Sequence, residues 1–138
     1  MDSGRTVSAA LGASGLLRDV PTRQAPTLPA GPTFRAENRM IIVTGTIQAR
    51  ADTVDELRRL SLEHVARSRA EPGCLEHGVA IDANDGLRLV FFERWADRAA
   101  LDAHFKVPAS GSFVRDAARL AAQRPTIEIY EAQPSAVR

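Results

Sequence analysis

The stretch Leu87–Trp95 (LRLVFFERW) restricts the fold of this chain more than any other, because its apolar side chains occupy both odd and even positions. A short run rich in β-branched and aromatic residues predicts a strand, and side chains on a strand point alternately to the two faces of a sheet. One predicted face carries Leu87, Leu89, Phe91 and Trp95, and the other carries Val90 and Phe92. A sheet built around this strand therefore needs apolar cover on both faces.

Three further strands are predicted around this one, at residues 40–49, 74–82 and 126–132. A capping-box pattern, Thr53–Glu56, opens a helix between the first two strands. Asp97 is expected to cap a second helix, which Pro108–Gly111 should break before it resumes over 112–123. The predicted element order is β-α-β-β-α-β.

This order, arranged as a split βαβ unit, predicts an α+β fold of the ferredoxin-like kind, with a four-stranded antiparallel sheet and its helices on one face. The other face of the sheet is also apolar, since the first strand places Ile42 opposite Ile41 and Val43. Apolar patches of several hundred Å² are rarely left in water. We therefore predict a homodimer in which two copies pack sheet to sheet.

Residues 1–39 precede the first strand and are poor in the side chains that build a core. Four prolines stand close together, at positions 21, 26, 29 and 32. Such a segment cannot bury enough apolar area to offset its ordering entropy. We expect a disordered tail, or translation that truly starts at Met40, ahead of one domain over 40–138.

Charge and cysteine content exclude several classes of protein. The formal net charge of +1 gives no electrostatic reason to expect a nucleic-acid partner, and no apolar run approaches the roughly 20 residues that span a bilayer. The lone Cys74 rules out an internal disulfide and fits a reducing compartment. The sequence thus predicts a cytoplasmic protein with neither a nucleic-acid nor a membrane partner.

No metal-binding motif is visible along the sequence. His64, His77 and His104 are the only histidines, and no two of them stand at i and i+4. The His-Glu-x-x-His motif and paired cysteines are also absent. From local spacing, then, no metal site is expected.

Three motifs, in their order along the chain, resemble the antibiotic biosynthesis monooxygenase family, above all its small quinol-monooxygenase-like members. They are Glu71–Leu75 (EPGCL), Phe92–Trp95 (FERW) and His104, which follows the tryptophan by nine positions. The resemblance spans about residues 40–132. It implies a dimeric α/β barrel with a pocket between sheet and helices. It also implies oxygenation of phenols or quinols by O2, with no cofactor.

The same resemblance assigns residues to the pocket. Trp95 matches the family's pocket tryptophan, His104 its second-helix histidine, and Arg115 a pocket arginine of polyketide-modifying members. Phe91 replaces the asparagine of those members, and Gly45 replaces an asparagine of the haem-degrading members. The second histidine of quinol-type members is missing.

Chemistry without a cofactor needs a base, since a phenolate or enolate gives an electron to O2 far more readily than its neutral form. His104 is the predicted catalytic base, because the ordinary pKa of histidine lies near 6.5. Glu93 shares a strand face with Phe91 and Trp95 and is expected to orient His104 or to bridge an arginine. The predicted substrate-binding residues are Trp95, Phe91, His64, Arg115 and Tyr130. For each of these residues a purely structural role stays open.

The leading hypothesis is a cofactor-independent monooxygenase that oxidises a small quinol, phenol or enolisable aromatic with O2. One alternative is an isomerase that acts by enolisation. Another is a non-catalytic dimeric module that binds a small hydrophobic molecule. A third is haem binding and degradation, with His104 as the iron ligand.

Overall fold

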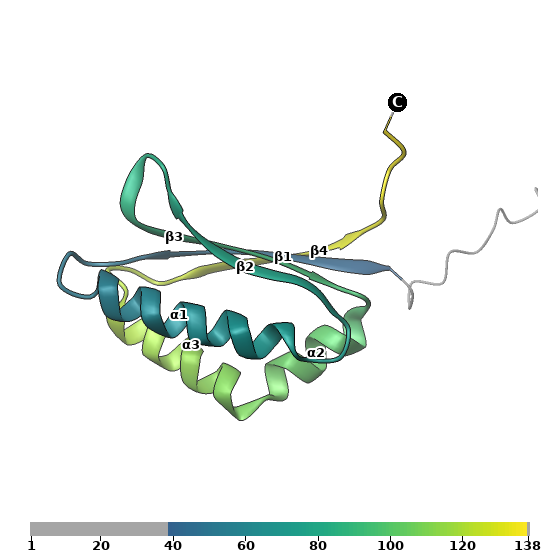
Figure 1. Ribbon diagram of the computed structural model, residues 1–138, viewed down its shortest axis with the longest axis horizontal. Coiled ribbons are helices and arrows are strands. Elements are labelled where there is room, and N and C mark those ends of the chain that lie inside the picture. Colours follow the sequence, from purple (N-terminus) through teal and green to yellow (C-terminus); the bar gives the residue numbers. More distant parts are fainter. Residues whose placement is uncertain (1–38, 138) are drawn as a thin grey trace, which may run out of the picture. The chain divides into compact units, whose positions relative to one another are not determined.

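The structure is a computed structural model that describes residues 39–137 of the chain (Figure 1). The predicted tail lies, apart from Arg39, outside the described residues. The elements follow in the order β1 (Met40–Gln48), α1 (Val54–Arg69), β2 (Cys74–Asp82), β3 (Asp85–Trp95), α2 (Arg98–Lys106), α3 (Pro108–Leu120) and β4 (Thr126–Ala132). None of the helices over this range is long and apolar enough to cross a membrane.

The four strands form one antiparallel sheet in the order β2-β3-β1-β4. Figure 1 shows α1, α2 and α3 together on one face of this sheet, while the opposite face carries none of the described helices. This is the strand order of a split βαβ arrangement. The predicted α+β, ferredoxin-like fold is confirmed.

The core lies between the sheet and the helices. Its side chains include Ile41 and Val43 on β1, Leu89 and Trp95 on β3, and Leu57 on α1, each at most 2% exposed. The outer face of the sheet is only partly covered, and Phe92 there is 39% exposed. The predicted two-sided apolar character of β3 is therefore present, with one side buried and the other open.

α1 begins directly after Thr53, as predicted, but two details of the predicted helix ends were wrong. The side chain of Thr53 makes no capping hydrogen bond at the start of α1; its hydroxyl donates instead to the carbonyl oxygen of Leu120, 2.7 Å away, and joins α1 to the end of α3. Pro108–Gly111 does not break a helix but forms the first turn of α3. Proline suits that position because the first helical N–H has no intrahelical partner. The break is confined to Val107.

The predicted cap of α2 is confirmed, since the Asp97 side chain accepts a hydrogen bond from the backbone N–H of Ala100. The turn between α1 and β2 packs against the same helix. Gly73 has φ +81°, and a Cβ at this position would lie 2.5 Å from the Cβ of Ala100. This close approach, which only glycine permits, sets the turn that carries Glu71 beside α2.

The register of β2 changes near its start. Cys74 pairs with Trp95 and Glu76 with Arg94, so the pairing shifts at Leu75, which is 52% exposed. Such an irregularity re-aims the side chains that follow it. His77, two residues after Leu75, is 1% exposed.

Candidate functional site

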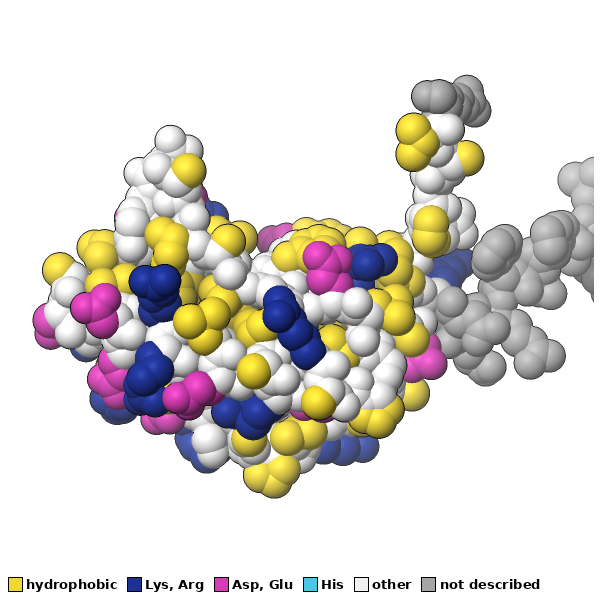
Figure 2. Space-filling view, in the orientation of Figure 1, with side chains coloured by type: hydrophobic (Ala, Val, Ile, Leu, Met, Phe, Trp, Pro, Cys, Tyr) yellow, Lys and Arg dark blue, Asp and Glu magenta, His cyan; other side chains and the backbone are white. Residues whose placement is uncertain are grey.

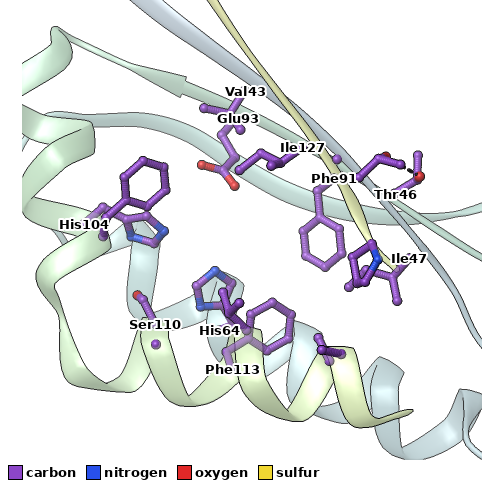
Figure 3. Close-up of a pocket in the computed structure, with 18 of the residues that line it drawn as sticks. Val43, Thr46, Ile47, His64, Phe91, Glu93, His104, Ser110, Phe113 and Ile127 are labelled. Atoms are coloured by element: carbon purple, nitrogen blue, oxygen red, sulfur yellow. Dashed lines mark hydrogen bonds between the residues drawn. The ribbon is translucent and has the colours of Figure 1, made fainter. Parts of the chain in front are cut away.

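A cavity of about 520 Å³ lies between the inner face of the sheet and the helices (Figure 3). Its wall is mostly apolar, formed by side chains of β1, β3, α3 and the start of β4, among them Val43, Ile47, Phe91, Phe113 and Ile127. Figure 3 shows His104, Glu93 and His64 gathered on one side of the cavity, away from Ile47. The cavity thus has a mostly apolar wall, with two histidines and a buried carboxylate on one side.

The two histidines belong to a cluster of all three histidines of the chain. His64 comes from α1, His77 from β2 and His104 from α2, and all three are buried. One ring nitrogen from each lies within 4.8 Å of those of the other two. His64 and His104 line the cavity, whereas His77 lies behind the wall. The fold therefore brings together three imidazoles that are far apart in sequence.

His104 is held on two sides. Its Nδ1 lies 2.8 Å from Oε2 of Glu71, and its ring centroid lies 4.7 Å from that of Trp95. Because a carboxylate accepts hydrogen bonds, Nδ1 is the nitrogen that donates to Glu71, and Nε2 is the ring nitrogen that this contact leaves free. Glu71 and Trp95 thus fix the orientation of the His104 ring.

Glu93 is the buried carboxylate beside the cluster. Its Oε2 accepts a hydrogen bond from the Trp95 indole nitrogen at 2.8 Å, and its Oε1 lies 3.2 Å from Nε2 of His77. The second contact is within ion-pair distance but lacks the alignment of a hydrogen bond. Burial acts to raise the pKa of Glu93, but the contacts with His77 and with the Trp95 N–H outweigh it and hold the pKa below its usual value. Glu93 is therefore ionised at neutral pH.

His64 stacks on Phe113, with ring centroids 4.2 Å apart and planes 7° from parallel. Its Nδ1 is buried and finds no hydrogen-bond partner among residues 39–137. Burial, with the neighbouring His77 and His104, lowers the pKa of His64 to about 3. This ring stays uncharged at neutral pH.

A comparison with protein families gives a match to the antibiotic biosynthesis monooxygenase model over residues 40–116. The matched segment runs from β1 into α3 and contains every residue of the histidine cluster. The chain belongs to the antibiotic biosynthesis monooxygenase family.

Individual relatives agree with this membership. An uncharacterized protein of Synechocystis sp. is 37% identical over 91 residues, which are 66% of this chain and 62% of that relative. The chain therefore spans less than two thirds of that relative's length. A solved structure of an antibiotic biosynthesis monooxygenase is 30% identical, with a TM-score of 0.63 over 68% of this chain and 99% of that one. A Mycobacterium tuberculosis protein gives 26% identity and a TM-score of 0.66, over 71% and 99% of the two chains.

In this family member, the structure brings some of the predicted site residues together. His104, Glu93, His64 and Phe91 line the cavity. Trp95 does not; it is fully buried behind His104 and holds Glu93. The expected pairing of Glu93 with His104 is replaced by two separate pairs, Glu71 with His104 and Glu93 with His77.

Arg115 and Tyr130 are not brought to the cavity. Arg115 is exposed on α3 and donates to the hydroxyl of Ser112 at 3.1 Å. Tyr130 is 48% exposed on β4, paired with Ile42 of the outer face, and its hydroxyl donates to Glu128. Neither position supports contact with a molecule inside the cavity.

Sequence reasoning missed Glu71 and His77 as site residues. Glu71 stands in the turn motif that suggested the family, but its side-chain direction depends on how the turn packs on α2. His77 pairs with Glu93 across the sheet, and this register was not visible in the strand pattern. Gly45 lines the cavity, and a side chain there would place its Cβ 3.0 Å from the carbonyl oxygen of Thr126.

Proposed function

We propose that this chain is a monooxygenase that uses O2 to oxidise a small quinol, phenol or enolisable aromatic, with no flavin or nicotinamide. The observation that carries the proposal is His104, whose Nδ1 is held by Glu71 and whose ring lines a mostly apolar cavity. General-base catalysis by a positioned imidazole typically contributes about 10²–10⁴-fold to a rate.

The cavity suits a planar apolar molecule of one or two rings. Its volume of about 520 Å³ lies within the roughly 300–1,000 Å³ of small-molecule pockets. Phe91 and Phe113 offer aromatic faces, and their ring centroids lie 5.9 Å apart. A ring placed against them would present its hydroxyl group to the side of the cavity that holds His64 and His104.

The proposed reaction begins when Nε2 of His104 takes the hydroxyl proton of the substrate, and the Glu71 carboxylate stabilises the resulting imidazolium. The phenolate passes one electron to O2, and the two radicals combine to form a C–O bond. Loss of water then converts the ring C–H into C=O. One atom of O2 enters the product, the other leaves as water, and the substrate supplies all four electrons. No external reductant is needed.

We further propose that the protein acts as a homodimer in the cytoplasm. The outer face of the sheet holds partly exposed apolar side chains, Phe92 among them, and none of the helices over 39–137 covers it. Figure 2 shows hydrophobic side chains along the edge of the domain where the sheet lies. A second copy packed on this face would remove them from water. The free Cys74 fits a reducing compartment.

The test is oxygen consumption by protein stripped of metal, with a panel of hydroquinones and naphthols. Uptake is expected with at least one substrate, and the His104→Ala variant should lose about 10²–10⁴-fold. Arg115→Ala is the matched control and should keep the wild-type rate. Conversion of substrate without oxygen uptake would favour the enolisation isomerase, and tight binding without turnover would favour a binding module.

A further inference from the structure

We propose that His64, His77 and His104 form a binding site for one divalent transition-metal ion of the zinc class. The three imidazoles converge from α1, β2 and α2, and one ring nitrogen of each lies within 4.8 Å of the others. This inference goes beyond the proposed oxygenation and does not depend on it, because binding is measured without substrate.

The spacing is close to that of a bound ion. Zn–N bonds of about 2.0–2.1 Å in a tetrahedral site place the ligand nitrogens roughly 3.4 Å apart. The nitrogens lie within 4.8 Å of one another, so binding an ion requires them to approach by up to about 1.4 Å, which we expect rotations of the rings to supply.

Some buried imidazole nitrogens of the cluster lack a hydrogen-bond partner, and a bound metal ion would give them one. The His77 side chain is fully buried, and its Nε2 faces Oε1 of Glu93 at 3.2 Å. Within the described part of the chain, Nδ1 of His77 and Nδ1 of His64 have no hydrogen-bond partner. Buried polar atoms are nearly always paired, so two unpaired imidazole nitrogens in one cluster call for a ligand. A cation with free coordination positions supplies it.

Two carboxylates lie beside the proposed histidine ligands and are placed to orient their rings. Glu71 accepts from Nδ1 of His104, and Glu93 lies 3.2 Å from Nε2 of His77. Histidines that bind metals almost always offer their other ring nitrogen to a carboxylate, a carbonyl or water. The two carboxylates also offset the charge of a divalent ion in a buried place.

The donor set selects the class of ion. Three imidazoles suit Zn²⁺, Cu²⁺, Ni²⁺ or Fe²⁺, whereas Ca²⁺ and Mg²⁺ prefer oxygen. Three protein ligands leave a fourth position for water or substrate, as in catalytic zinc sites. Because His64 and His104 line the cavity, an ion bound to both would lie at the cavity wall. The lone pair of His104 cannot bind an ion and accept a proton at once, so the loaded and metal-free cavities differ in chemistry.

The experiment titrates Co²⁺, then Zn²⁺, into the full chain after chelator treatment, with no histidine tag. We expect one Co²⁺ per chain, with the strong visible absorption of low-coordinate cobalt, and its displacement by Zn²⁺. His64→Phe and His77→Phe should each weaken binding more than about 100-fold, and Glu71→Gln about 10–100-fold. Cys74→Ser, which removes the only thiol, should bind as wild type.

A second measurement needs no variant. The chain has three histidines, so an NMR spectrum of the imidazole nitrogens contains three ring systems. All three should shift on saturation with Zn²⁺. Absence of binding, unchanged affinity in both phenylalanine variants, or imidazole signals that stay in place would each overturn the proposal. Circular dichroism of each variant shows whether a loss of binding comes from a loss of fold.

Discussion

The Nδ1 atom of His104 on α2 lies 2.8 Å from a carboxylate oxygen of Glu71, which stands in the turn after α1. Two segments separated by 33 positions thus meet in one contact. The contact fixes the tautomer of the imidazole and the direction in which its basic nitrogen points. The turn between α1 and β2 is therefore part of the site as well as part of the fold.

Loss of the Glu71 charge should slow the proposed reaction while the protein stays folded. In Glu71→Gln the amide still accepts from Nδ1, but the imidazolium formed in the reaction loses its counter-charge. We expect kcat to fall about 10–100-fold, since charge-assisted hydrogen bonds are worth about 1.5–3 kcal/mol. Glu76→Gln, which alters an exposed pair with Arg94, is the control and should leave kcat unchanged. Equal rates for the two variants would contradict the role of Glu71.

Gly73 should tolerate no side chain. Gly73→Ala places a Cβ at φ +81° and 2.5 Å from the Cβ of Ala100, so we expect the free energy of unfolding to fall by about 2–4 kcal/mol. Gly86→Ala is the matched control, because a Cβ there meets nothing within 4 Å. Urea denaturation of both variants measures the difference. A Gly73→Ala protein as stable as Gly86→Ala would mean that the turn packs differently.

Trp95 should act as a core residue that also holds Glu93. Trp95→Ala should destabilise the protein by about 3–5 kcal/mol, because the side chain is fully buried. Trp95→Phe keeps much of the volume but removes the N–H that Glu93 accepts, at a cost of about 1–3 kcal/mol. Chemical denaturation measures both. Unchanged stability of Trp95→Ala would show that the indole stands in open space.

The proposed dimer depends on the outer face of the sheet. Phe92→Lys introduces a charge on this face and should shift the protein from dimer to monomer. Leu62→Lys changes a side chain of similar exposure, 51%, on the helical side and should leave the dimer intact. Sedimentation velocity distinguishes the two outcomes. A wild-type protein that sediments as a monomer would exclude the sheet-to-sheet arrangement.

Most of the fold was predictable because it depends on local patterns. The strand at Thr126–Ala132 was predicted to the residue, and Asp97 was correctly identified as a helix cap. The start of α1 was also predicted, but its capping hydrogen bond was not, because the hydroxyl of Thr53 donates to the distant carbonyl oxygen of Leu120. Propensity describes what a segment does alone, whereas this contact exists only once α3 is in place.

The site was less predictable because it depends on register and packing. His104 was identified from a motif, but the histidines share no local spacing that would predict their cluster. His77 reaches it only through the pairing of β2 with β3, next to a shift in register at Leu75. Glu71 reaches it because Gly73 lets the turn pack on Ala100. Contacts of this kind are set by tertiary structure. Local sequence spacing, from which no metal site was expected, therefore neither predicts nor excludes them.

The measurement that tests the central claim most directly starts from metal-stripped protein and a hydroquinone or naphthol that it oxidises. The reaction is run under ¹⁸O₂, and the product is analysed by mass spectrometry. Exchange of quinone oxygens with water is corrected with a labelled standard. The proposed reaction predicts one ¹⁸O atom per product molecule, and product formation that falls with His104→Ala. Unlabelled product, or turnover that continues without O2, would contradict the assignment of this cavity as a monooxygenase site.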